Sequence, residues 1–253
     1  MPRRNEGVKK SLLEAIQKLD ENPNLVAMAE HFSESIFDQN QFNNLEQVRK
    51  WLEDRAKECK MRVEKINLKD AKGWSFDEKT GNLVHESGGF FSVIGVRISN
   101  SEFREAGQGW DQPMIDQGNE SGIAGILMKR FNGIPHYLLE AKAEPGNYGK
   151  VQLSATLQVT FSNLKQLHKG RKPLFSEFFE NPDKHKVLYA QWLPEDGGRF
   201  YMKRTYNMLV EADEDKEIEV PNGFIWVTLY QIKELLKQDN LVNPHVRSVI
   251  AHL

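Results

Sequence analysis

Residues 136–160 alternate between two kinds of side chain, and one kind could transfer protons. His136, Glu140, Lys142 and Glu144 share one parity in the first half of this stretch. Successive side chains of a β-strand point to opposite faces, so in a strand these groups project from the same face. Carboxylate, imidazole and ammonium groups held close together shift one another's pKa values. Tyr148, in the turn that follows, adds a phenol.

The second half of the stretch continues the alternation with amides and hydroxyls, which suit a polyhydroxylated ligand. The residues of this set are Gln152, Ser154, Thr156, Gln158 and Thr160. A Pro-Gly-Asn segment joins the two halves, and the positions between the polar residues are mostly apolar. The pattern predicts a β-hairpin with one apolar and one polar face. Two interpretations of the polar face stay open: the wet surface of an antiparallel sheet, or the floor of a ligand site.

The sequence predicts both helices and strands around this hairpin, and they must hold it in position. Residues 1–65 are typical of a helical segment, in which Asn44 precedes an apolar stripe that includes Trp51, and the stripe favours a core position for Trp51. From residue 66 short strands and turns follow, including a hairpin signal at Asn132 and Gly133. Thr228 is a candidate N-cap for a C-terminal helix. We therefore predict an α+β chain with an N-terminal segment (1–65) and a second unit (66–253).

Composition narrows the possible partners. The chain has 253 residues, of which 39% are hydrophobic and 28% charged, with a net charge of -2. This charge gives no electrostatic basis for binding nucleic acid or an anionic membrane. One local basic cluster, at residues 168–172, favours a solvated loop and leaves phosphate contact open. The single cysteine, Cys59, excludes an intrachain disulfide framework and a cysteine-rich zinc site.

Targeting and cofactor motifs are missing from the sequence. No apolar run is long enough to span a bilayer, and the first residues lack the apolar core of a signal peptide, so we expect a cytoplasmic protein. The sequence has no dinucleotide fingerprint, phosphate-binding loop, zinc-binding H-E-x-x-H, nucleophile elbow or EF-hand loop. Nothing in the sequence therefore supports a redox cofactor or a metal site.

Several longer strings resemble one enzyme family, the sugar nucleotide 2,3-dehydratases of deoxysugar biosynthesis. The strings occur in the family's order: HESGGFFSVIGVRIS, GWDQPMI, GIAGIL, GIPHYLLEAKAEPGN, VQLSATLQVT, GGRFYMKRTYNMLVE and LVNPHVRSVI. The resemblance covers roughly residues 40–253. It implies a Nudix-like α+β fold, a mixed or antiparallel sheet flanked by helices. Family members resemble a tandem of two such units, whereas this chain has one, so we predict a homodimer that replaces the tandem. The Nudix hydrolase box is absent, which disfavours metal-dependent hydrolysis.

The resemblance also implies a reaction. The substrate class is a nucleoside-diphospho-4-keto-6-deoxyhexose, typically the thymidine form. A base removes the C3 proton, which the C4 ketone acidifies, and the C2 hydroxyl leaves as water, giving a 3,4-diketo-2,6-dideoxy sugar. The substrate's own ketone accepts the electrons, so no cofactor is required.

Such a site needs a base, an acid and a group that stabilises charge on the C4 oxygen. Glu140, Glu144 or His136 is the predicted base, and Lys142 or Tyr148 is predicted to steady that oxygen or protonate the leaving hydroxyl. A neighbouring ammonium lowers the pKa of a carboxylate and burial raises it, and the sequence does not decide between them. The same residues could instead form a structural ladder of salt bridges.

Substrate-binding residues follow from the same motifs. Gln152, Ser154, Thr156 and Gln158 are candidates for hydrogen bonds to the sugar and nucleotide. Arg97, Arg199 and Arg204 are candidates for the diphosphate, because guanidinium grips phosphate with two parallel hydrogen bonds. Trp110 and Gln112, in the GWDQP string, complete the set, and Trp110 either stacks on the base or belongs to the core. A non-catalytic sugar-nucleotide binding module is the alternative function.

Overall fold

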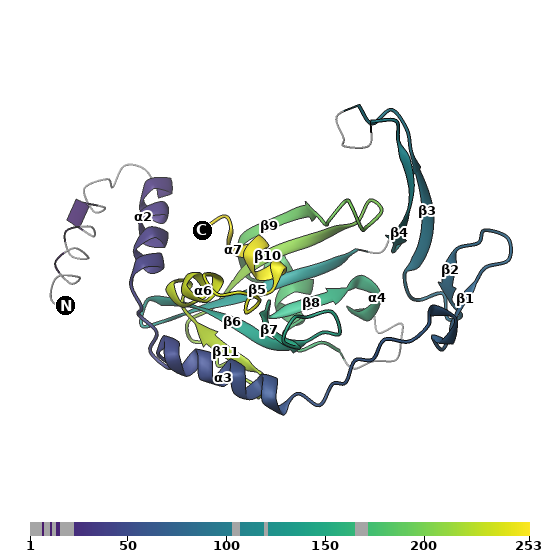
Figure 1. The fold of residues 1–253 in the computed structure, drawn as a ribbon. Coiled ribbons are helices and arrows are strands. Elements are labelled where there is room, and N and C mark those ends of the chain that lie inside the picture. The colour runs from purple at the N-terminus through teal and green to yellow at the C-terminus, as the bar shows by residue number, and fades with distance from the viewer. Residues whose placement is uncertain are drawn as a thin grey trace.

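The computed structural model describes residues 23–102, 107–118, 121–164 and 172–253, together with positions 7, 11, 14 and 15. The body of the molecule is a mixed sheet with helices on both faces, and a separate sheet projects from it as an arm (Figure 1). The predicted α+β class, with helices ahead of the sheet, is confirmed.

The body sheet has the strand order β11-β6-β5-β10-β9, with β7 paired to β6 and β8 paired to β5. Strands β5 and β10 run parallel, and the other pairs are antiparallel. The bounds are β5 (Gly122–Phe131), β6 (Ile134–Ala143), β7 (Val151–Ser154), β8 (Leu157–Thr160), β9 (Lys186–Pro194), β10 (Arg204–Ala212) and β11 (Phe224–Val227).

The turn between β5 and β6 is the predicted two-residue hairpin. Asn132 (φ 49°) and Gly133 (φ 78°) both adopt the left-handed conformation. A type I′ turn requires this at both central positions, and asparagine and glycine tolerate it best. The turn sets the register in which Lys129 lies opposite His136.

The predicted hairpin of residues 136–160 forms only in part. Strand β7 pairs with β6, with Glu140 opposite Ser154, but the chain then leaves β6 and continues as β8 along β5. The turning point is Thr156, whose buried hydroxyl accepts a hydrogen bond from the Leu127 amide (2.8 Å) and donates one to the Leu138 carbonyl. Leu127 and Leu138 are the pair beyond which β5 and β6 separate. Thr156 thus satisfies backbone groups that the separation would leave unpaired.

The prediction of one apolar and one polar face for this stretch is wrong. Leu139 and Leu153 belong to one buried cluster, whereas Leu138 and Leu157 belong to a second cluster on the other side of the sheet. Apolar residues therefore cover both faces of β6 up to Leu139. The sheet is central rather than superficial, so helices bury both of its sides.

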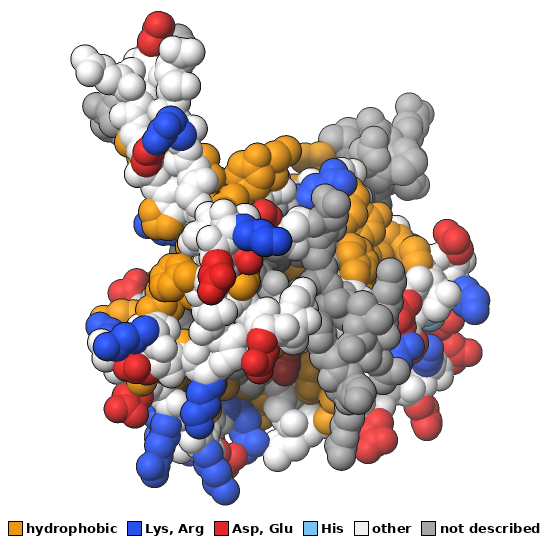
Figure 2. Space-filling model, turned by 90° about the vertical axis from the view of Figure 1, so that its right-hand side faces the viewer, with side chains coloured by type: hydrophobic (Ala, Val, Ile, Leu, Met, Phe, Trp, Pro, Cys, Tyr) orange, Lys and Arg blue, Asp and Glu red, His pale blue; other side chains and the backbone are white. Residues whose placement is uncertain are grey.

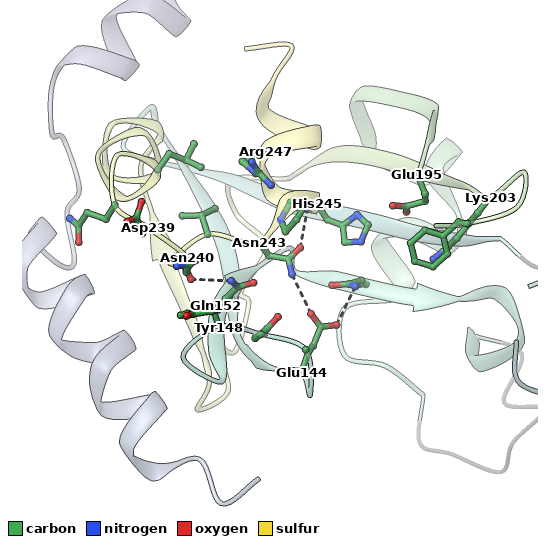
Figure 3. Close-up of a pocket in the computed structure, with 18 residues that line it drawn as sticks. Glu144, Tyr148, Gln152, Glu195, Lys203, Asp239, Asn240, Asn243, His245 and Arg247 are labelled. Carbon is green, nitrogen blue, oxygen red and sulfur yellow. Dashed lines mark hydrogen bonds between the residues drawn. The ribbon is translucent and has the colours of Figure 1, made fainter. Parts of the chain in front are cut away.

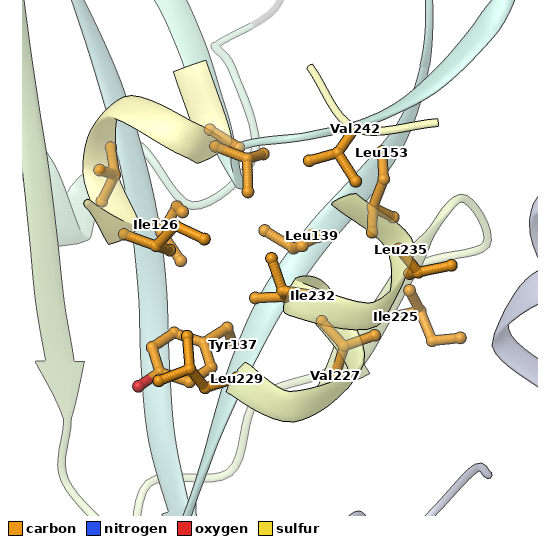
Figure 4. Packing of buried hydrophobic residues seen from close by; sticks show 14 of the residues in the cluster. Ile126, Tyr137, Leu139, Leu153, Ile225, Val227, Leu229, Ile232, Leu235 and Val242 are labelled. Carbon is orange, nitrogen blue, oxygen red and sulfur yellow. The ribbon is translucent and has the colours of Figure 1, made fainter. Parts of the chain in front are cut away.

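The first cluster holds most of the helices to the sheet (Figure 4). It joins α3 (Leu45–Glu58), α6 (Leu229–Leu236) and α7 (Pro244–Ile250) to strands β5, β6, β7 and β11. The second cluster includes Phe178 and Phe179 of the short helix α5 (Glu177–Glu180), and Leu164 of α4 (Phe161–Leu164). A 3-10 turn follows α5 at Pro182–Lys184.

Local signals fix where the main helices begin. Asn44 caps α3 and Thr228 caps α6, each in a capping box in which the third helical residue, a glutamine, bonds back to the cap. Thr228 was the predicted N-cap, and Asn44 stands where the sequence predicted the residue before the helix. The predicted apolar stripe packs on the body, because Val48 and Leu52 are buried in the first cluster and Trp51 packs against it. The division at residue 65 stays a prediction.

Helix α2 (Pro23–Ile36) and the arm extend from the body (Figure 1). The arm comprises a 3-10 turn (Leu68–Asp70) and the strands β1 (Trp74–Phe76), β2 (Leu83–His85), β3 (Ser92–Ile98) and β4 (Trp110–Asp116). Figure 2 views this end of the molecule and shows hydrophobic side chains at the surface among charged ones. None of the helices in the described ranges is long and apolar enough to cross a membrane.

Candidate functional site

A cleft of about 800 Å³ opens at the carboxyl end of β6 (Figure 3). Three connections line it: the β6–β7 turn with Glu144 and Tyr148, the start of α7 with Asn243 and His245, and the β9–β10 turn with Lys203. These connections are far apart in the sequence, and the sheet brings their ends together.

Two further cavities adjoin this cleft. One, of about 270 Å³, shares Glu144, Gln158, Lys203 and His245 with it and adds Lys142. The other, of about 480 Å³, is also lined by Lys203, together with Arg204, Asp116 and Ser121. Lys203 therefore lines all three spaces, and Glu144 and His245 lie where the first two meet.

Glu144 is held by amides. Gln158 Nε2 donates a hydrogen bond to one carboxylate oxygen (3.4 Å), and Asn243 Nδ2 donates to the other (3.3 Å). Ser154 donates to the Gln158 side chain (3.1 Å), and Lys142 Nζ donates to the Gln158 carbonyl (3.3 Å). Four of the predicted site residues thus form one network with Asn243.

His245 is positioned by Asn243, the buried N-cap of α7. The Asn243 side-chain oxygen accepts a hydrogen bond from the backbone amide of His245 (3.0 Å), and Pro244 occupies the first helical turn. Burial lowers the pKa of the His245 imidazole. Lys203 and Lys142 lower this pKa as well, while Glu195 and Glu144 act to raise it.

At Glu140, burial has a larger effect on the carboxyl pKa than the neighbouring ammonium group of Lys142. Its pKa is raised, mainly because of burial, although Lys142 acts to lower it. Glu144 acts in the same direction as burial. Glu140 is paired with Ser154 and Phe224 within the sheet and does not line the cavities described above.

His136 and Tyr148 lie at opposite extremes of exposure. His136 is fully buried, its Nδ1 donates to the Ile134 carbonyl (2.9 Å), and its Nε2 accepts from the Gln41 amide (3.3 Å). Burial lowers the pKa of His136. Tyr148 is 81% exposed and lies at the rim of the cleft. The structure therefore brings Glu144 and Lys142 together but places His136 in the core.

The predicted sugar-binding residues divide into two groups. Gln152 and Gln158 line the cleft, and Gln152 also donates to the Asn240 carbonyl (3.0 Å). Ser154 and Thr156 are buried, with their hydroxyls engaged by Gln158 and by the backbone of β5 and β6. These two hydroxyls serve the fold and the network that holds Glu144.

Most of the predicted diphosphate and base contacts lie elsewhere. Arg97 pairs with Asp111 (2.9 Å) on the exposed face of the arm, and Trp110 donates to Gln112 (2.7 Å) on the same sheet. Gln112 also donates to the Gly198 carbonyl (3.2 Å), and Arg199 is exposed beside it. Arg204 stacks over the Trp192 ring at 4.4 Å and lines the 480 Å³ cavity.

Of the basic cluster, positions 168–171 lie outside the described residues, and Lys172 pairs with Glu180 (2.6 Å). Across the described residues no group of three or more His, Cys, Asp and Glu side chains is placed to hold a metal ion.

Residues 45–253 match the family model described as NDP-hexose 2,3-dehydratase. The chain belongs to the NDP-hexose 2,3-dehydratase family. The match includes every residue that lines the cleft, and the predicted family is thereby confirmed.

Similar members of the family come from three species and carry the name dTDP-4-dehydro-6-deoxy-alpha-D-glucopyranose 2,3-dehydratase. The protein of Saccharopolyspora spinosa is 41% identical over 79% of this chain, that of Amycolatopsis orientalis 40% over 82%, and that of Streptomyces violaceoruber 39% over 80%. The matched regions span only 40%, 44% and 45% of those proteins, so the chain spans less than half the length of the relatives it matches.

Two solved structures show a weak likeness to this family member. An ADP compounds hydrolase matches with a TM-score of 0.37 and 10% identity, over 75% of this chain and 92% of that one. The Ap4A hydrolase of C. elegans matches with a TM-score of 0.28 and 9% identity, over 49% and 88%. TM-scores this low do not identify a shared fold. The Nudix-like part of the fold prediction therefore continues to rest on the sequence resemblance.

Among the cleft residues of this family member that sequence reasoning missed are Lys203, Asn243 and His245. Each lies in a string that carried the family resemblance, GGRFYMKRTYNMLVE or LVNPHVRSVI. The Asn-Pro pair also signals a helix start, which would have placed His245 in the first turn. Only the fold shows that these segments meet Glu144.

Proposed function

We propose that this cleft eliminates water from a nucleoside-diphospho-4-keto-6-deoxyhexose, as a sugar nucleotide 2,3-dehydratase. The observation that carries the proposal is the cleft together with the adjoining 270 Å³ cavity. These two spaces bring together the carboxylate of Glu144, the ammonium groups of Lys142 and Lys203, and the imidazole of His245, from segments that all lie within the family match. The names of the relatives support the 4-keto-6-deoxyglucose form of the sugar, linked to dTDP.

The charges suit an enolate intermediate. Removal of the C3 proton places negative charge on the C4 oxygen, and a fixed cation beside that oxygen lowers the barrier. Lys142 is half-buried and its ammonium group is anchored on the Gln158 carbonyl, so it reaches this position with little reorganisation. We assign this role to Lys142 and place Lys203 beside it on the cleft wall.

Glu144 is the one predicted base that lines the cleft. Because both of its oxygens already accept amide hydrogen bonds, the carboxylate is fixed in orientation. A fixed carboxylate with remaining lone pairs is suited to accept hydrogen bonds from sugar hydroxyls. We therefore assign Glu144 to holding the sugar, with Gln152 and Gln158 beside it.

For the diphosphate, Lys203 and Arg204 are the cations that line the 480 Å³ cavity. Arg97, Trp110, Gln112 and Arg199 stay predicted binding residues that the cleft does not include.

The first test is incubation with dTDP-4-keto-6-deoxyglucose, followed by mass spectrometry for loss of one water. We expect the dehydrated product from the chain alone. If the ligand raises the melting temperature without any turnover, the alternative, a non-catalytic binding module, gains. If neither occurs, the proposed site is wrong.

The predicted homodimer and cytoplasmic location belong to this proposal as well. Large hydrophobic side chains are exposed on α2, such as Phe32 (55%), and on the arm, such as Phe76 (61%), which is the kind of surface that a second copy would cover. Analytical ultracentrifugation of the chain tests the dimer, and cell fractionation tests the location.

A further inference from the structure

Burial lowers the pKa of three histidines, His136, His245 and His252, and His245 differs from the other two in its ring contacts. The rings of His136 and His252 each bond to a backbone carbonyl. The backbone amide of His245 is bonded, but in the described ranges its ring nitrogens have no hydrogen-bond partner. The ring is half-buried and lines both the 800 Å³ cleft and the 270 Å³ cavity.

Asn243 connects His245 to Glu144. One end of the Asn243 amide accepts from the His245 backbone, and the other end donates to the Glu144 carboxylate. Asn243 is itself 4% exposed, and its backbone is paired with Leu153 of β7 (2.9 Å). The backbone of His245 is therefore fixed beside the residue assigned to hold the sugar, and its imidazole lines the cleft there (Figure 3).

The stereochemistry of the substrate limits where a base can lie. In a glucose-configured ring, the C3 hydrogen and the C2 hydroxyl lie on the same face. One group on that face can remove the C3 proton and then deliver it to the departing hydroxyl. It must be unprotonated at the start, must have a lone pair that is free to accept the proton, and must lie within reach of both atoms.

We propose that His245 is the catalytic residue that takes the C3 proton and returns it to the C2 hydroxyl, an assignment that rests on the proposed dehydratase function. The free ring nitrogens, the fixed backbone and the position at the junction of the two cavities support this role. Glu144 orients the sugar, and Lys142 faces the C4 oxygen.

The step balances without a further reactant. An imidazole nitrogen takes the C3 proton, the C3–H pair forms a C3=C4 bond, and the carbonyl pair moves to the C4 oxygen. The oxygen pair then re-forms the ketone, the C3=C4 pair moves to C2=C3, and the C2–O bond breaks. The imidazolium gives its proton to the leaving oxygen, which departs as water, and the resulting enol becomes the 3,4-diketone.

The charges around the ring fit a base that works at neutral pH. Lys142 and Glu144 face it from the β6 end, and Glu195 and Lys203 face it from the β9–β10 turn. Burial holds the pKa of His245 below its usual value of about 6.5, so the ring is neutral at pH 7. The acid limb of kcat/KM should therefore lie below about pH 6.5.

The test compares His245→Asn with His252→Asn in the full chain, using dTDP-4-keto-6-deoxyglucose as substrate. Asparagine keeps a polar side chain at position 245 but cannot carry the proton. The pKa of His252 is also lowered by burial, but His252 lies outside the cleft, which makes it a matched control. We expect kcat to fall by about 10²–10⁴-fold in His245→Asn, with KM changed by less than about threefold, and no fall in His252→Asn.

Lys203→Met provides a second readout. Removing this positive charge should raise the pKa of His245 and move the acid limb of kcat/KM to higher pH, whereas Glu195→Gln should move it to lower pH. An unchanged kcat in His245→Asn overturns the assignment, and so does an acid limb that moves in neither variant. If the unmodified chain releases no water, the proposed function fails and the assignment falls with it.

Discussion

Both ends of strand β6 carry an ionisable side chain that the sequence marked as a candidate base, but one end is buried and the other borders the cleft. At the His136 end, β5 and β6 are paired directly, and the segment before α3 closes over them, so that Gln41 and Phe42 contact the imidazole. At the Glu144 end, β5 and β6 have separated, and the cleft opens between the connecting turns. A histidine near the start of β6 and a glutamate just beyond its end thus become a core residue and a cleft residue.

This comparison shows what distinguishes a site from a satisfied polar residue. His136 has both ring nitrogens bonded and no exposed surface, so it has no capacity left for a ligand. Glu144 is also bonded, but to side chains that line an open space. His136 and Glu144 have the same parity in the alternating sequence. Their roles differ because other segments cover β6 at the His136 end and leave a cleft at the Glu144 end.

Among the tests of this comparison, the largest effect is expected at the open end. Lys142→Met removes the cation proposed to face the C4 oxygen, and loss of one such stabilising group costs about 10²–10³-fold in kcat. Lys57→Met, on the exposed surface of α3, is the control and should leave kcat unchanged. A normal kcat in Lys142→Met would mean that the cleft end of β6 is no more important for catalysis than the buried end.

His136→Ala tests the closed end and should give the reverse result. The change leaves a cavity and strips the partners from the Gln41 amide and the Ile134 carbonyl, which we expect to cost about 2–4 kcal/mol in free energy of unfolding. Urea denaturation measures it, with His85→Ala on the arm as a milder control. The kcat per folded molecule should stay normal. A fall in kcat that exceeds the loss of folded protein would make His136 a candidate base again.

A somewhat smaller loss of free energy of unfolding is expected at Thr156, where β5 and β6 separate. Thr156→Val keeps the shape of the side chain but leaves the Leu127 amide and the Leu138 carbonyl without their partner, at a cost of about 1–3 kcal/mol. The Thr160 hydroxyl, at a part-exposed position of β8, also accepts a hydrogen bond, from the Asn163 amide (3.4 Å), but water can replace it there, so Thr160→Val should cost less than about 1 kcal/mol. Equal values in urea denaturation would mean that the hydroxyl of Thr156 does not secure the separation of β5 and β6.

The smallest effect is a pH dependence at the closed end. Because burial lowers the pKa of His136, the unfolded chain takes up a proton near pH 6.5, where the folded protein does not. The stability contributed by neutral His136 is therefore lost as pH falls below about 6.5. The stability difference between the unmodified chain and His136→Ala should narrow between about pH 7.5 and 5.5, and a difference that stays constant would contradict the shift.

Local features of the fold could be read from the sequence because their causes are local. Asn44 and Thr228 cap helices through residues three positions away, and the turn at Asn132 and Gly133 needs only its own backbone conformation. The apolar stripe that contains Trp51 predicted the buried face of α3 for the same reason. The family strings likewise identified the family without any structure.

The candidate site was predicted in part. Glu144, Lys142, Gln152 and Gln158 line the cleft or its neighbour as expected, whereas His136 and Thr156 serve the core and the sheet. The prediction failed at Thr156 because a period of two cannot show where a strand changes its partner. It missed Asn243, which binds Glu144 from 99 residues further along the chain.

The sequence by itself therefore determined the family, the α+β class, the caps and the turns, since each depends on neighbouring residues or on motifs along the chain. The tertiary structure alone decided which end of β6 is open and which histidine reaches the cleft. Those outcomes depend on where β5 and β6 separate and on which distant segments pack against the gap. Contacts between segments this far apart have no periodicity that a linear pattern could reveal.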